Sequence, residues 1–302
     1  MAGGPVGDLA GEPAGDPAVE RAAEPVGGAP VRAPGLSPSR AKDFQQCPLL
    51  FRFRVVDRLP EPSSQPAARG TLVHAVLEAL FDSPAPERTV EQALRLLDPH
   101  WQRLLERDPA LAELFGSPEE LTAWLDSARV LIGRYFEIED PTRLAPRARE
   151  LRVDHQLESG PALRGIIDRV DVAPNGWVRI VDYKTGRSPR PGYEADALFQ
   201  MRFYAFVVWR TRGVLPRTLQ LEYLGDGTLV THEPTEAEMV TFETRIRALW
   251  TTILEVAASG RWTPRPSPLC SWCSFRDLCP QFGGTPPPID EAALQRAFGP
   301  AA

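Results

Sequence analysis

The sequence lacks any apolar run that approaches the roughly 18 to 20 residues needed to cross a membrane. It also lacks the basic and then apolar start that is typical of a signal peptide. Of its 302 residues, 43% are hydrophobic and 25% are charged, which excludes a largely disordered chain and predicts a globular fold. We therefore expect a cytoplasmic protein with no membrane partner.

The chain has no excess of positive charge. Its formal net charge is −6, and residues 1–35 account for −3 of this through five acids and two arginines. This balance does not support a protein that coats nucleic acid through bulk positive charge, and it leaves open a local basic groove. Lysine is scarce, because only Lys42 and Lys184 occur among the 34 cationic side chains. A lysine beside candidate catalytic groups is therefore unusually informative.

Hydrophobic periodicity and turn residues divide the chain into three parts. Residues 1–35 contain six prolines and eight glycines and are predicted to be a disordered tail. Residues 36–283 are predicted to form one α/β domain, and residues 284–302 a C-terminal tail. The expected helices lie within 37–53, 71–81, 89–105 with an interruption at Pro99, 117–135, 194–210 and from 235 onward. The expected strands are 149–157, 165–173, 177–184, 218–224 and 228–232.

Residues 165–186 are expected to form a hairpin whose register follows from its turn. With a three-residue loop at 174–176, Asp168 faces Asp182, and Lys184 lies on the same face. A two-residue loop would place the two aspartates on opposite faces. Adjacent carboxylates repel one another unless a cation lies between them. The pattern therefore favours a site for Mg²⁺ or Mn²⁺ over two solvated aspartates at the end of a sheet.

Asp168, followed by Asp182-x-Lys184, resembles the active site of the PD-(D/E)XK nuclease superfamily, and specifically its RecB/AddB-like exonuclease branch. This resemblance spans nearly all of residues 36–283. It implies a restriction-endonuclease-like α/β core, in which helices flank a mixed central sheet. An N-terminal helical portion and a C-terminal cysteine cluster would accompany this core.

Further segments match motifs of the same branch. The segment that ends in His74, Arg69-Gly-Thr-x-x-His74, is similar to the first helical motif, which implies that His74 is a metal ligand. Gln200-x-x-x-Tyr204 resembles the final motif and places both side chains on one helix face, where they would position the substrate or the site. Glu150 is a weaker match to a glutamate of the family. Without the resemblance, His74 would be interpreted as a buried core histidine. Gln200 and Tyr204 would be ordinary positions on an amphipathic helix.

The resemblance implies a catalytic role for each residue. Asp168, Asp182, His74 and the backbone carbonyl of Tyr183 would hold Mg²⁺ or Mn²⁺, and Lys184 would orient or help deprotonate the attacking water. The expected activity is that of a metal-dependent deoxyribonuclease, an exonuclease acting on DNA with free ends or single strands in repair or recombination. A helicase is a compatible partner. The alternative is a non-catalytic DNA-binding or partner-docking module of the same fold.

The four cysteines are Cys47, Cys270, Cys273 and Cys279. In a cytoplasmic chain this set indicates a metal site before it indicates disulfides. The division into one and three cysteines differs from the paired clips of a zinc ribbon. It is similar to the spacing in iron–sulfur nucleases of the same branch, which implies a [4Fe-4S] cluster that ties the two ends of the domain together. Structural Zn²⁺ is the alternative.

Overall fold

The computed structural model describes residues 34–190 and 194–299, so nearly all of the expected N-terminal tail lies outside the described residues. The described α-helices are α1 (Pro38–Gln46), α2 (Pro48–Phe51), α3 (Gln65–Leu80), α4 (Val90–Arg107), α5 (Pro118–Ile138), α6 (Glu194–Arg212), α7 (Glu236–Ser259) and α8 (Glu291–Phe298). The described strands are β1 (Gly35–Leu36), β2 (Ala148–Gln156), β3 (Ala162–Val172), β4 (Val178–Lys184), β5 (Thr218–Tyr223) and β6 (Thr228–His232). No described helix is long and apolar enough to cross a bilayer.

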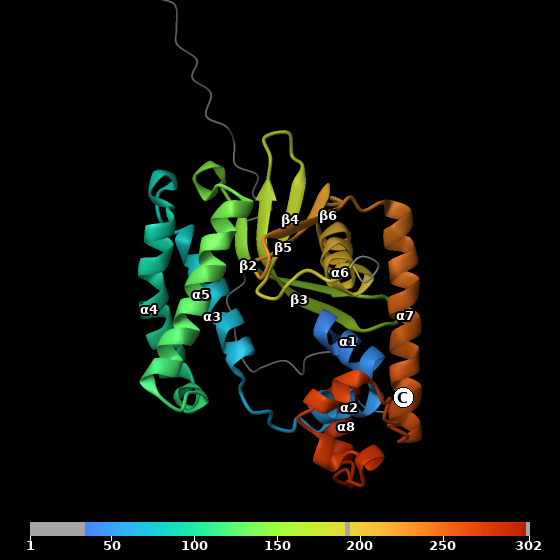
Figure 1. The fold of residues 1–302 in the computed structure, drawn as a ribbon. Helices are drawn as coiled ribbons and strands as arrows, with labels where there is room; N and C mark the ends of the chain where they lie inside the picture. Colours follow the sequence, from blue (N-terminus) through green and yellow to red (C-terminus); the bar gives the residue numbers. More distant parts are fainter. Residues whose placement is uncertain (1–33, 191–193, 300–302) are drawn as a thin grey trace, which may run out of the picture. The chain divides into compact units, whose positions relative to one another are not determined.

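The strands of the described chain form one mixed sheet of six strands (Figure 1). Its order is β1-β3-β4-β5-β6. Strand β2 pairs with β3 along the edge opposite to β1 and β4. The pairs β1–β3 and β4–β5 are parallel, and the remaining pairs are antiparallel. Helix α6 lies between the parallel strands β4 and β5 in the chain and so forms the crossover. The predicted α/β fold with helices flanking a mixed central sheet is confirmed.

Two helix starts follow the capping signals in the sequence. Ser117 accepts a hydrogen bond from the backbone N–H of Glu120 at the start of α5, and Thr235 accepts one from Glu238 at the start of α7, both at 3.2 Å. A cap of this kind contributes about 1 kcal/mol to stability. The predicted interruption at Pro99 is wrong, because α4 continues through it. Pro99 is exposed, so water can hydrogen-bond the carbonyl that loses its helical partner.

Apolar side chains form two hydrophobic clusters, one on each face of the sheet. One joins the sheet to α1, α2, α6 and α7, and the other joins it to α3, α4 and α5. Strand β4 contributes to both, because Ile180 belongs to the first cluster while its neighbour Val181 belongs to the second. Figure 1 shows α3 to α5 on one side of the strands and α6 with α7 on the other.

Part of the segment expected to be a C-terminal tail is the packed helix α8. Its Ala293 is buried, and Phe298 stacks against Phe51 and Trp262 with ring centroids 6.4 Å apart in each case. An eight-residue helix has little stability of its own and depends on such packing. The first and last helices of the described chain therefore contribute to the same core.

Candidate active site

The β3–β4 hairpin has the register predicted from its turn. Four pairs run from Val172–Val178 to Arg169–Val181. Gly176, with φ of +83°, supplies the left-handed residue of the three-residue loop. The ladder stops one pair before the two aspartates, so the backbone opens at the point where the carboxylates lie.

Asp168 fills this opening with its side chain. On the edge of β3 that faces β4, β1 pairs with the first residues of the strand and β4 pairs with residues 169–172. Between these pairings, the Oδ2 atom of Asp168 accepts a hydrogen bond from the backbone N–H of Tyr183 at 2.7 Å. In a regular strand, Ile167 and Val170 would lie on opposite faces, because they are three residues apart. Both belong to the same hydrophobic cluster, so the alternation of side chains is interrupted here. Strict alternation in the sequence could not predict this.

Asp182, Lys184, Gln200 and Tyr204 are linked by hydrogen bonds and one ion pair. Lys184 Nζ lies 2.6 Å from Asp182 Oδ2 and donates a hydrogen bond to Gln200 Oε1 at 2.8 Å. Gln200 Nε2 lies 2.8 Å from Asp182 Oδ1 and 3.0 Å from the Tyr204 hydroxyl, and it can donate to both. The structure therefore brings together four residues that the sequence analysis took from two separate motifs.

His74 reaches the same opening from α3. Its Nδ1 atom lies 3.5 Å from Asp168 Oδ2, and its Nε2 atom lies 3.0 Å from the carbonyl oxygen of Tyr183. The side chain is 28% exposed, so it is not a fully packed core histidine. Burial lowers the pKa of His74, but hydrogen bonding to Asp168 and its negative charge outweigh burial and raise it. The imidazole thus belongs to the acidic site.

Glu150 is more central than its weak sequence match indicated. It lies opposite Asp168, because β2 and β3 pair on both sides of that position. His74, Glu150 and Asp168 each offer one ligand atom, and these three atoms lie within 4.8 Å of one another. Glu150 has a φ of +44°, an arrangement that costs about 1–3 kcal/mol in a non-glycine residue and is concentrated at functional sites. Its position depends on β2–β3 pairing, for which the local sequence holds no signal.

These donors fit a divalent cation. Glu150, Asp168 and Asp182 offer carboxylate oxygens, with an imidazole and a backbone carbonyl beside them, which suits Mg²⁺ or Mn²⁺. Burial and then the charge of Asp168 raise the pKa of Asp182 to about 6, and the same causes raise the pKa of Glu150. A cation would relieve this mutual repulsion. Asp182 is not one of the three mutually close donors and is held by Lys184 instead.

The four cysteines line one pocket, and the residues of the candidate active site do not line it. None of them forms a disulfide. The backbone N–H of Arg265 donates to Cys47 Sγ at 3.4 Å, and that of Ser267 donates to Cys270 Sγ at 3.3 Å. Cys47 lies between α1 and α2, so the pocket joins the start of the described fold to a segment more than 200 residues later.

The fold described above is consistent with that of the PD-(D/E)XK nuclease superfamily. The chain belongs to that family, whose sequence profile matches residues 35–280. It is 26% identical over 283 residues to the Gene 69 protein of Mycobacterium phage D29, an alignment that covers 83% of this chain and 98% of that protein. Its fold is similar to that of a candidate exonuclease from Eubacterium rectale, with a TM-score of 0.54 and 18% identity. That alignment covers 85% of this chain and 91% of the other.

Proposed function

We propose that this nuclease is a metal-dependent deoxyribonuclease, an exonuclease of the RecB/AddB-like branch that acts on DNA ends or single strands during repair or recombination. The observation that carries the proposal is the meeting of His74, Asp168, Asp182 and Lys184 at the gap between β3 and β4. The description of the Eubacterium rectale neighbour as a candidate exonuclease agrees with it. A cytoplasmic location and a helicase partner that supplies single strands are compatible with this role.

The proposed ligands are Glu150, Asp168, Asp182, His74 and the carbonyl oxygen of Tyr183. A bound Mg²⁺ or Mn²⁺ lowers the pKa of a coordinated water and offsets negative charge on the phosphate. Because the donors come from four different elements, with Asp182 and Tyr183 sharing β4, the ligand set depends on tertiary packing. It is assembled only when α3, β2, β3 and β4 are in place.

Lys184 is the proposed catalytic cation. Asp182 and Gln200 hold its ammonium group from two directions, at 2.6 and 2.8 Å, so its position is fixed before substrate arrives. From there it orients the attacking water and stabilises the negative charge that develops on the phosphate. The side chain is 30% exposed, which leaves it accessible to substrate.

Gln200 and Tyr204 are proposed to position these groups. Gln200 contacts both Asp182 and Lys184, and the Tyr204 hydroxyl lies beside the Gln200 amide. Tyr204 can approach β3 closely because residue 165 is glycine, where a Cβ atom would lie 2.5 Å from the tyrosine ring. The close approach of Tyr204 to β3 thereby fixes how far the Gln200 and Tyr204 side chains extend from α6 toward the site.

We further propose that Cys47, Cys270, Cys273 and Cys279 hold a [4Fe-4S] cluster. Their convergence on one pocket and the backbone N–H groups directed at two of the sulfurs support a bound metal centre, because such hydrogen bonds stabilise thiolates. Structural Zn²⁺ is the alternative for the same ligands. Iron and zinc content, with the visible absorbance of anaerobically purified protein, distinguishes the two.

The proposed function predicts that the protein degrades linear DNA only when Mg²⁺ or Mn²⁺ is present. End-labelled single- and double-stranded DNA should lose label progressively, EDTA should stop the reaction, and covalently closed circles should resist it. Cleavage of closed circles would instead indicate an endonuclease. DNA binding without cleavage under every metal condition would favour the non-catalytic module.

His74→Ala is expected to increase the Mn²⁺ concentration needed for half-maximal cleavage by about 10-fold or more, because one donor to the cation is lost. Its melting temperature should fall little, since the imidazole is partly exposed. The measurement is the initial rate against Mn²⁺ concentration, and His100→Ala on helix α4, outside the candidate site, is the matched control. An unchanged Mn²⁺ dependence with a much lower melting temperature would assign His74 to packing.

A further inference from the structure

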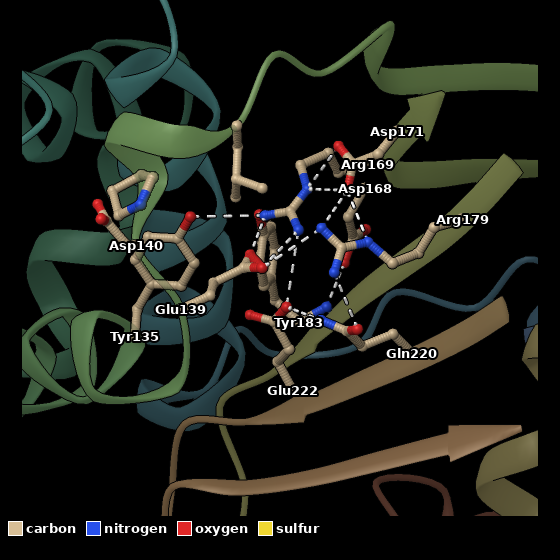
Figure 2. Close-up of polar contacts among 12 residues, drawn as sticks. Tyr135, Glu139, Asp140, Asp168, Arg169, Asp171, Arg179, Tyr183, Gln220 and Glu222 are labelled. Atoms are coloured by element: carbon tan, nitrogen blue, oxygen red, sulfur yellow. Dashed lines mark hydrogen bonds and ion pairs between the residues drawn. The ribbon is translucent and has the colours of Figure 1, made fainter. Parts of the chain in front are cut away.

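A buried ionic network lies directly behind the candidate active site (Figure 2). Its centre is Arg169, whose side chain is fully buried. The guanidinium donates hydrogen bonds to the Tyr183 hydroxyl at 2.6 Å, to Glu139 at 3.0 Å and to Asp171 at 3.2 Å. Glu222 completes the surroundings at 3.7 Å.

The charges of this network nearly cancel. Arg169 and Arg179 are balanced by Glu139 and Asp171, with Arg179 lying 2.7 Å from Asp171. Burial, together with the negative charge of Glu139, raises the pKa of Glu222 to about 8, which favours its neutral form. A buried network of this kind adds little net stability compared with apolar residues of the same volume, because desolvation offsets the attraction. A contribution to stability alone therefore does not account for the network.

The network connects three of the elements that hold the proposed metal ligands, α3, β3 and β4, to helix α5. Arg169 follows Asp168 in β3, Glu139 caps the end of α5, and Tyr183 lies in β4. The guanidinium also lies over the ring of Phe81, the residue that caps α3, at 5.6 Å from the ring centroid. Since α3 carries His74, one buried side chain contacts both the helical layer and the strands at the site.

Tyr183 transmits this contact to the site itself. Its hydroxyl is held by Arg169, while its backbone N–H donates to Asp168 and its carbonyl oxygen faces His74. Its ring also packs edge-on against the imidazole, with centroids 5.9 Å apart. The position of the hydroxyl group and the position of the backbone groups are therefore coupled through one rigid side chain.

We propose that Arg169 is a positioning residue for divalent-cation binding, acting through the Tyr183 hydroxyl to hold the Tyr183 carbonyl and His74 at the spacing that the cation requires. The proposal rests on the proposed function for the identity of the metal site. The proposal adds the ionic network around Arg169 as a determinant of metal affinity. None of the network's side chains is proposed to contact the cation.

Tyr183→Phe tests this link with minimal disturbance, because it removes one hydroxyl group and leaves the ring and backbone. Mn²⁺ binding by the DNA-free protein should weaken by about 10-fold, as it does when outer hydrogen-bond partners of metal ligands are lost elsewhere. Binding is measured by calorimetry and by the electron paramagnetic resonance signal of free Mn²⁺. The Mn²⁺ concentration needed for half-maximal cleavage should increase in parallel.

Tyr135→Phe is the matched control. The Tyr135 hydroxyl is also buried beside Arg169, at 3.5 Å, but the proposed metal site uses no backbone group of Tyr135. Equal Mn²⁺ affinities in wild type and Tyr183→Phe would overturn the proposal, as would equal weakening in both variants. If wild type binds Mn²⁺ but cuts no DNA, the proposed function fails, and selective weakening in Tyr183→Phe still supports the positioning role. Absence of Mn²⁺ binding in wild type would overturn both.

Discussion

Lys184→Ala should lose metal-dependent DNA cleavage by about two to three orders of magnitude while the protein folds normally. The expected loss reflects removal of a fixed positive charge at the position where negative charge develops on the phosphate. The folded state should tolerate the change, since the Lys184 side chain is partly exposed and Gln200 still donates a hydrogen bond to Asp182. Initial rates on end-labelled DNA at saturating Mn²⁺ measure the effect.

Lys42→Ala is the matched control, because Lys42 is the chain's other lysine and lies in α1, outside the candidate site. It should cleave DNA at the wild-type rate. Asp182→Ala should resemble Lys184→Ala, since it removes both a proposed ligand and the lysine's ion-pair partner. Wild-type cleavage by either active-site variant would remove the nuclease assignment from these residues.

Cys47→Ser should destabilise the whole domain by more than an ordinary core substitution. Cys47 is the proposed cluster ligand from the N-terminal side, and the other three lie at residues 270–279. In structural metal sites the free energy of metal binding contributes directly to the free energy of folding, on the order of 10 kcal/mol for zinc-finger peptides. Loss of this tie should release the C-terminal segment from α1 and α2 and reduce the bound iron.

The measurements are iron content, visible absorbance, melting temperature and proteolysis within residues 260–283, each compared with wild type. Ser271→Ala is a suitable control, because Ser271 lies in the same exposed turn between two of the cysteines. It should keep the metal and the protease resistance. Unchanged iron and protection in Cys47→Ser would show that Cys47 is not a ligand.

The hairpin register could be predicted because its determinants are local. A loop of Pro174, Asn175 and Gly176 restricts the turn to one geometry, and the cross-strand pair Asp171–Arg179 favours the same alignment. Capping residues likewise identified the starts of α5 and α7. In each of these cases the deciding contact joins residues close together in the sequence.

The features that the sequence missed or indicated only weakly depend on contacts between distant segments. Glu150 joins the site only because β2 pairs with β3, and α8 is stable only where it packs on the first helices. Arg169 is adjacent to Asp168 in the sequence, but its burial requires Glu139 and Glu222 from other elements. No periodicity or turn signal encodes such partners, so these parts of the fold became visible only in three dimensions.

The opening between β3 and β4 places stability and the proposed catalysis in competition. Asp168 occupies it with a side chain, so the N–H group of Tyr183 bonds to a carboxylate instead of to a neighbouring strand. A residue that let the ladder continue would lengthen the sheet and remove the carboxylate from the site. The sheet is thus locally frustrated at its proposed functional edge. Engineering guided by thermostability alone would restore the ladder there and remove a proposed metal ligand.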